Sequence, residues 1–252
     1  TELTGSTLTQ IAVRSDGKIY AAGYFSNWQQ KRLLLLNADG TIDASFDVDF
    51  GNVEYSGLIA LAVQPDDRVL VSGGFQTVNS LPRNHIARLN PDGTLDETFD
   101  SGSTLGEWSR TSDARSIVLE PDGHVWLSGH ACLSNGTPIR LIRLEPNGQL
   151  DDAFYAQAGE MHVAGDRTHI ETLTALPDGR VYVGGVFDSF NNEPCANLAR
   201  LLPDGTLDTS FNPTWSNLLE VRMLALQPDG KLLVGGPPLN GPPHHGDLVR
   251  FN

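Results

Sequence analysis

The sequence predicts an all-β protein, a five-bladed β-propeller with almost no helix, and three observations support this. A tight turn of the Pro-Asp-Gly type recurs five times in the 252 residues, each time followed by a short apolar run that ends in glycine. A second tight turn follows in four of the five copies. No segment keeps the 3.6-residue apolar period of a helix, and a unit of about 50 residues with three or four strands is typical of propeller repeats.

The first turn is expected to join two strands in each copy. Proline sets φ for a turn, aspartate hydrogen-bonds the backbone ahead of it and glycine adopts positive φ, so apolar runs on both sides predict a hairpin. In the second copy we expect strands over residues 58–64 and 68–73 around the turn at 65–67. The turn aspartates lie about 50 to 56 residues apart and are Asp16, Asp66, Asp122, Asp178 and Asp229.

The second turn precedes a Leu/Ile-Asp-x-x-Phe motif. In the second copy, residues 85–90 predict a third strand, and residues 94–99 predict either a fourth strand or a single helical turn capped by Asp96. Leu95 and Phe99 share a face in either case. The four turns are Asp39-Gly40, Asp92-Gly93, Asn147-Gly148 and Asp204-Gly205.

One such sheet cannot bury both of its faces alone, whereas sheets stacked radially cover one another. We therefore predict a single domain over residues 1–252, with blades at about 5–50, 56–101, 112–156, 168–213 and 219–252. The fifth copy stops after its third strand, so residues 1–4 would complete it in a closed ring. The alternatives are a three-stranded last blade and five blades of a larger ring.

The turns, the Gly-Gly strand ends and the Ala-Arg-Leu … Asp-Gly-Thr-Leu-Asp-x-x-Phe pattern resemble the delta-sixty repeat, a propeller-forming repeat of bacterial, mostly exported proteins. The resemblance covers nearly the whole chain and implies the same fold. It also implies an extracellular or cell-surface location. No signal peptide opens the chain, and Thr1 stands in place of an initiator Met, so we expect a processed or excised segment of a longer protein.

Charge and hydropathy exclude several function classes. The chain holds 31 acidic and 17 basic residues, a formal net charge of −14. A nucleic-acid-binding protein needs a basic face to displace counterions from phosphates, and an anionic membrane surface is disfavoured for the same reason. The apolar runs are strand-length, too short for membrane insertion.

Cys132 and Cys195 occupy different positions in neighbouring repeats, so we expect free, partly buried thiols.

Because the strands of a blade run up and down, both tight turns should lie on one face of the ring and the longer connections on the other. These connections differ in sequence from copy to copy, and function tends to sit on loops that a rigid scaffold presents. Their aromatic side chains could stack on sugar rings or anchor a protein ligand, or they could simply fix their own loops. The aromatic residues are Trp28, Tyr55, Trp108, Tyr155 and Trp215.

The first residue of the innermost strand should lie beside the central channel, close to this variable face. It changes from copy to copy in the order Thr9, Ile59, Arg115, Glu171 and Arg222. Arg115, Glu171 and Arg222 predict a small polar pocket for an anionic or hydroxyl-rich ligand. A mutual salt-bridge network at the channel rim is the alternative.

A charged pair recurs with the repeat and predicts a structural clamp. A catalytic group is needed once and a scaffold group in every blade, so we expect each arginine near the end of a third strand to bind the aspartate of the following motif. Leu35 replaces the arginine in the first copy. The arginines are Arg88, Arg143, Arg200 and Arg250, and the aspartates are Asp43, Asp96, Asp151 and Asp208.

No motif for catalysis, a metal or a cofactor is recognised. Residues 47–52 resemble part of a calcium loop but lack the closing glutamate of an EF-hand. Neither a nucleotide-binding glycine loop nor a serine elbow occurs. The crossover before the fourth copy holds possible ligands whose spacing matches no zinc motif, and solvated loop residues are expected there. They are Glu160, His162, Asp166, His169 and Glu171.

These observations predict a non-enzymatic recognition or adhesion module without a cofactor. Its ligand would be a glycan or a surface protein bound on the variable loop face, and homo-oligomers within a fibre or surface protein would add avidity. One alternative is a carbohydrate-active enzyme, which needs at least two carboxylates within about 10 Å at the channel mouth. The other is a passive structural or assembly module.

Overall fold

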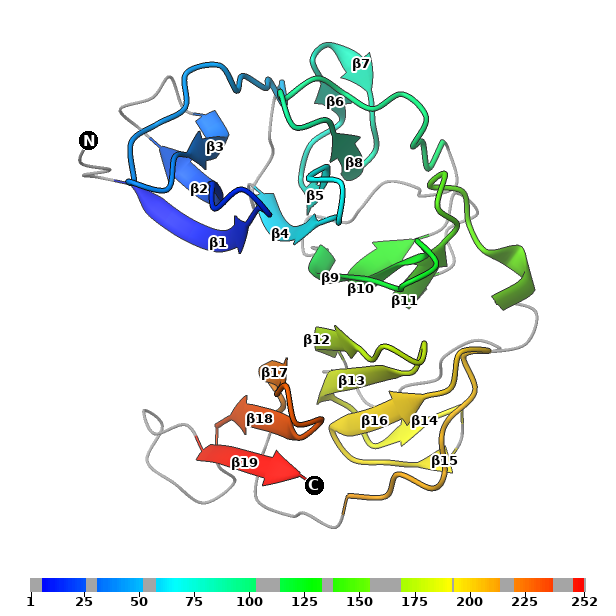
Figure 1. The fold of residues 1–252 in the computed structure, drawn as a ribbon. Helices are drawn as coiled ribbons and strands as arrows, with labels where there is room; N and C mark the ends of the chain where they lie inside the picture. Colours follow the sequence, from blue (N-terminus) through cyan, green and yellow to red (C-terminus); the bar gives the residue numbers. More distant parts are fainter. Residues whose placement is uncertain are drawn as a thin grey trace. The chain divides into compact units, whose positions relative to one another are not determined.

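The computed structural model describes residues 6–25, 31–51, 58–102, 114–132, 138–154, 169–191, 193–213, 220–237 and 247–251. Within these ranges the fold is almost entirely β, and the helical residues form a single turn at 152–154 (Figure 1). No helix in the described part of the chain is long and apolar enough to cross a membrane.

Five three-stranded sheets follow one another along the chain, one for each repeat (Figure 1). In each sheet the strands are hydrogen-bonded in sequence order. The sheets are β1 (Thr7–Val13), β2 (Ile19–Phe25) and β3 (Lys31–Leu36); β4 (Leu58–Val63), β5 (Val69–Gly73) and β8 (Ile86–Leu89); β9 (Ala114–Leu119), β10 (Val125–Cys132) and β11 (Pro138–Leu144); β12 (His169–Ala175), β13 (Val181–Val186) and β16 (Leu198–Leu201); and β17 (Met223–Leu226), β18 (Leu232–Gly236) and β19 (Asp247–Phe251).

The chain divides into two compact units, and the third sheet supplies residues to both. The first unit comprises Thr1–Ile117, His130–Pro138 and Leu144–Leu150. The second comprises Val118–Gly129, Ile139–Arg143 and Asp151–Asn252.

The tight turns form where the sequence predicts them, because glycine at the turn position adopts positive φ. In the second blade Asp67 takes this position with a φ of 64°, which few non-glycine residues adopt. Its carboxylate accepts hydrogen bonds from the backbone N–H and the hydroxyl of Ser15, at 2.9 and 2.8 Å. The substitution of aspartate for glycine therefore joins the first turn of this blade to the first turn of its neighbour.

The Leu/Ile-Asp-x-x-Phe motif forms one bridge and a turn, so the prediction of a fourth strand is wrong in the described blades. After the bridge the motif aspartate accepts a backbone hydrogen bond, which competes with a continued strand ladder. In the third blade Asp151 caps the helical turn by accepting from Phe154 N–H at 3.0 Å. The bridges are Leu36 to Ile42, Leu89 to Leu95, Leu144 to Leu150 and Leu201 to Leu207.

Two of the connections expected to vary have the same architecture. In the second blade a hairpin of β6 (Thr77–Val78) and β7 (Leu81–Pro82) lies between β5 and β8. In the fourth blade β14 (Ser189–Phe190) and β15 (Glu193–Pro194) repeat it between β13 and β16. These two connections differ in sequence, as the sequence analysis noted, but they share one hairpin architecture.

Apolar side chains of consecutive sheets fill the space between them. In the first unit one buried cluster joins Tyr20 and Leu33 of the first blade to Leu61 and Val71 of the second. The phenylalanine of the motif packs edge-on against the aromatic residue of the middle strand. These pairs are Tyr20 with Phe46 at 5.5 Å, Trp126 with Phe154 at 4.8 Å and Tyr182 with Phe211 at 5.1 Å between ring centroids.

Cys195 is a free, half-buried thiol, as expected. Burial raises the pKa of this thiol to about 11, so it stays protonated and unreactive at neutral pH. The side chain of Cys132 lies outside the described residues.

Candidate functional site

The innermost strand begins with a β-bulge in three of the blades. The register with the middle strand shifts between Leu8 and Gln10, between Leu58 and Ala60 and between Ile170 and Thr172. The residues at the bulges are Thr9, Ile59 and Glu171, the position that sequence analysis selected. A bulged residue is left out of the ladder and its side chain is re-aimed, so the ladder places little restriction on which residue stands there.

A glycine near the end of the middle strand lies against the residue two places before the bulge position. A Cβ atom on this glycine would collide with the carbonyl oxygen of that residue, so only glycine permits the approach. A Cβ on Gly23 would lie 2.0 Å from Thr7 O, one on Gly185 2.1 Å from His169 O, and one on Gly236 1.9 Å from Glu220 O. These glycines thus place the backbone of a second set of residues, two before the bulge position, against the end of the middle strand.

In the second unit these two sets of positions bring four ionisable side chains together, which we call the His169 cluster: His169, Glu171, Glu220 and Arg222. His169 Nε2 lies 3.1 Å from Oε1 of Glu220 and 3.6 Å from Oε1 of Glu171. Arg222 Nε donates to Oε2 of Glu220 at 2.9 Å. His169, Glu171 and Glu220 are half-buried, whereas Arg222 is exposed.

Glu220 is held in its ionised form. Burial raises the pKa of this carboxyl, but hydrogen bonds from His169 and Arg222 outweigh it, and the pKa lies below its usual value. A carboxylate with a lowered pKa accepts hydrogen bonds and is a poor general acid near neutral pH. The cluster therefore combines carboxylate acceptors with a guanidinium donor.

The same residues have the composition of a metal site. Candidate ligand atoms of His169, Glu171 and Glu220 lie within 4.8 Å of one another, and imidazole with carboxylates suits several divalent metals. Arg222 already binds Glu220, however, so a cation would have to compete with a guanidinium. Arg222 thus already meets one of the two carboxylates of the cluster without a metal.

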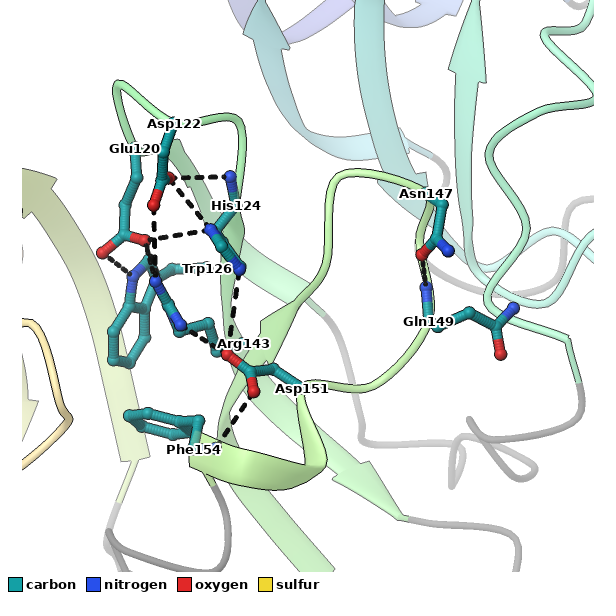
Figure 2. Close-up of polar contacts among 9 residues, drawn as sticks. All are labelled: Glu120, Asp122, His124, Trp126, Arg143, Asn147, Gln149, Asp151 and Phe154. Atoms are coloured by element: carbon teal, nitrogen blue, oxygen red, sulfur yellow. Dashed lines mark hydrogen bonds and ion pairs between the residues drawn. The ribbon is translucent and has the colours of Figure 1, made fainter.

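A second polar group lies beside the tight turns of the third blade (Figure 2). Glu120 is buried, accepts a hydrogen bond from Trp126 Nε1 at 2.9 Å and binds Arg143 through its other oxygen. Arg143 also binds Asp151. His124 Nδ1 lies 2.9 Å from a carboxylate oxygen of Asp122. These contacts extend the clamp of this blade, and we interpret the group as structural.

The predicted clamp is confirmed in three blades. Arg143 binds Asp151 in the third blade, and Leu35 in the first is compensated by Lys18, whose Nζ lies 2.6 Å from Asp43. Arg250, at the same position of the fifth repeat, is exposed. The other two clamps are Arg88 Nε to Asp96 at 2.7 Å and Arg200 Nε to Asp208 at 2.8 Å.

The clamp makes stability depend on pH. Burial raises the pKa of Asp96, but hydrogen bonds from Thr98, Arg68 and Arg88 outweigh it and hold the pKa well below 3.8. A lowered folded-state pKa contributes stability that is present above the unfolded value and lost as the pH falls toward the folded value. We expect the free energy of unfolding to fall as the pH drops below about 4, and to fall less in Asp96→Asn. Urea unfolding at pH 7 and pH 3 measures this.

The control for this experiment is Asp229→Asn, at an exposed turn aspartate. It should retain the acid sensitivity of the wild type. An Asp96→Asn variant as sensitive to acid as the wild type would contradict the assignment.

The structure brings together two of the predicted site residues, Glu171 and Arg222, through His169 and Glu220. Arg115 lies in β9 in the first unit, so its part in a pocket stays a prediction. His169 was expected as a solvated loop residue, but it begins β12 and is half-buried. Glu220 was not selected. Aligning the repeats at the residue two places before the bulge position would have found both.

The five predicted aromatic residues, Trp28, Tyr55, Trp108, Tyr155 and Trp215, all lie outside the described residues. Their part in ligand binding therefore stays a prediction.

A family model described as "Domain of unknown function (DUF5122) beta-propeller" matches residues 14–46, 64–99, 176–211 and 227–252, together just over half of the chain. The first three segments each run from the residue before the first tight turn to the motif phenylalanine. No curated protein matches the chain significantly.

Solved structures with a similar fold include two of virginiamycin B lyase from Staphylococcus aureus. One is a catalytically inactive histidine-to-alanine variant with quinupristin, at 16% identity and a TM-score of 0.54, covering 100% of this chain and 72% of that one. The other is selenomethionine-substituted, at 14% identity and a TM-score of 0.52, covering 100% and 71%.

The extracellular domain of a protein described as a one-component system of B. thetaiotaomicron is also similar. It shares 14% identity with a TM-score of 0.50, covering 99% of this chain and 32% of that one. At these identities the similarity shows a common β-propeller fold.

Proposed function

Because the chain belongs to the DUF5122 β-propeller family, which fixes its fold but no activity, we propose from the His169 cluster that it is a non-enzymatic recognition module for a glycan. The observation that carries the proposal is the pairing of two half-buried carboxylates, Glu171 and Glu220, with the exposed guanidinium of Arg222. Carboxylates accept hydrogen bonds from sugar hydroxyls, and arginine donates to ring and hydroxyl oxygens. The bulge at Glu171 and the glycine contact at Glu220 fix the backbone that carries the two carboxylates before a ligand arrives.

A neutral, hydroxyl-rich ligand fits this cluster better than an anion does. Two carboxylates stand against one arginine, with a histidine between them. The chain as a whole carries a formal charge of −14, so its field repels anions. Trp215 precedes Glu220 by five residues in the sequence and is the aromatic residue we propose to stack on a sugar ring.

The same proposal includes the repeat type and the cellular location of the module. The turn and motif pattern supports assigning the repeats to the delta-sixty type, whose members are mostly exported. We therefore place the module outside the cell or on its surface, as an adhesion domain. A surface protein is the second kind of ligand that its loops would suit.

A glycan array with the purified chain tests this function. We expect selective binding, and a loss of at least tenfold in apparent affinity in the double variant Glu171→Gln/Glu220→Gln, because the amides no longer offer two charged acceptors. The matched control is Glu97→Gln, at an exposed glutamate beside the tight turns of the second blade. Binding that survives in the double variant would rule out the cluster as the site.

One observation favours a carbohydrate-active enzyme as a second candidate. Candidate ligand oxygens of Glu171 and Glu220 lie within 4.8 Å of each other, close to the carboxyl spacing of about 5 to 5.5 Å in retaining glycosidases. The lowered pKa of Glu220 disfavours it as the acid such a reaction needs. Sugars released from the panel by the wild type but not by Glu171→Ala would favour the enzyme over the recognition module.

A further inference from the structure

Five polar positions around the first tight turn and the clamp carry balanced charge in three of the blades. They are the residue before the turn, the turn aspartate, the first residue after the turn, the third-strand clamp residue and the motif aspartate. In the second blade two carboxylates meet two guanidiniums there, with Arg68 bound to both Asp66 and Asp96, and Arg88 bound to Asp96. The five residues are Arg14, Asp16, Lys18, Leu35 and Asp43 in the first blade, Gln64, Asp66, Arg68, Arg88 and Asp96 in the second, and Leu176, Asp178, Arg180, Arg200 and Asp208 in the fourth.

The third blade lacks two positive charges at the same positions. Its residues are Glu120, Asp122, His124, Arg143 and Asp151, so three carboxylates face a single guanidinium. His124 stands where the other two blades with a clamp arginine have a second arginine. Protonation of the imidazole would supply only one of the two missing charges. Because Glu120 and Asp151 are buried, leaving this excess unbalanced is costly, and it points to a bound cation of charge +2.

Three of these side chains converge from one hairpin, the turn between β9 and β10 (Figure 2). One candidate ligand atom each from Glu120, Asp122 and His124 lies within 4.8 Å of the other two. His124 Nδ1 lies 2.9 Å from Oδ1 of Asp122 and 3.9 Å from Oε2 of Glu120. Two atoms bound to one Zn²⁺ at about 2.0 to 2.2 Å can lie up to about 4.4 Å apart, so small side-chain movements suffice to bind a metal.

The surroundings of the three side chains are those of a metal site. The side chain of Asp122 is 60% exposed, which gives a cation access from solvent. Histidines that bind a metal through one ring nitrogen usually donate the other N–H to a carboxylate. With Nδ1 on the metal, Nε2 of His124 carries that proton and faces Oδ2 of Asp151, 4.0 Å away.

We propose that the third blade binds a divalent transition-metal cation of the Zn²⁺ type through Glu120, Asp122 and His124. An imidazole with two carboxylates is a ligand set that suits such metals. The cation supplies the two positive charges that the other blades obtain from arginine or lysine. Arg143 remains bound to Glu120 and Asp151, so metal and guanidinium together neutralise the three carboxylates.

Isothermal titration of the chelator-treated chain with Zn²⁺ tests this. We expect the wild type to bind Zn²⁺, and the double variant Glu120→Gln/His124→Arg to lose at least about tenfold in affinity, because two of the three ligands are gone. The variant carries the residues of the second blade, Gln64 and Arg68, at both positions, so the clamp charges balance and the fold is kept. The matched control is Glu97→Gln, at an exposed glutamate, which should bind like the wild type.

Thermal unfolding gives a second readout. Zn²⁺ should raise the unfolding temperature of the wild type and of Glu97→Gln but not that of the double variant, since a cation that binds only the folded state stabilises it. A folded wild type that binds no Zn²⁺ overturns the proposal, as does a double variant that binds it as tightly as the wild type. In the first case, stability that rises as the pH falls from about 8 to about 5 would show that a proton on His124 takes the place of the metal.

Discussion

Arg143→Ala is expected to lower the free energy of unfolding by about 3 to 5 kcal/mol, the range seen when one partner of a buried ion pair is removed. Arg143 binds both Glu120 and Asp151, whose side chains are 2% and 5% exposed. Its loss leaves two buried carboxylates without the guanidinium that binds both of them. Urea unfolding followed by circular dichroism measures the change.

Arg250→Ala is the control, because Arg250 stands at the same repeat position but is exposed. A surface substitution of this kind should change the stability by less than about 0.5 kcal/mol. Equal losses in the two variants would show that the position matters through its packing in the sheet and not through its ion pairs.

The contrast between Arg143 and Glu120 shows what the repeat can and cannot predict. Arg143 recurs with Arg88 and Arg200, and recurrence alone identified the clamp. Glu120 occurs once, at a position that holds Gln64 in the second copy, so no pattern marks it. Its role depends on the neighbouring Trp126 Nε1, which needs an acceptor when buried.

Similar reasons limited the prediction of the fourth strand and of the candidate site. Leu95 and Phe99 fit a strand or a turn equally well, and only the hydrogen bonds of Asp96 to the Thr98 hydroxyl and N–H decide for the turn. In the His169 cluster Glu171 was found because the residue at this position differs between the aligned repeats. Glu220 was missed because only the position of the bulge residue was compared between repeats, whereas the glycine contact at Gly236 fixes the residue two places earlier.

Gly205→Ala should cause the second large loss of stability, about 2 to 5 kcal/mol. Gly205 has a φ of 82°, where alanine costs about 1 to 2 kcal/mol. The new Cβ would also lie 1.9 Å from the ring of Phe154. That ring packs edge-on against the buried Trp126 and has little room to move, so overpacking adds about 1 to 3 kcal/mol.

Gly40→Ala separates the two contributions. Gly40 occupies the same turn of the first blade with the same φ of 82°, but a Cβ there meets no atom within 4 Å. It should therefore lose only the backbone part, about 1 to 2 kcal/mol. Thermal and urea unfolding give the loss in free energy of unfolding for each variant. The difference between the two losses is the cost of the steric clash with the motif phenylalanine of the preceding blade. If the two variants lose equal stability, glycine is needed at this turn for its φ alone, and the contact between blades does not constrain it.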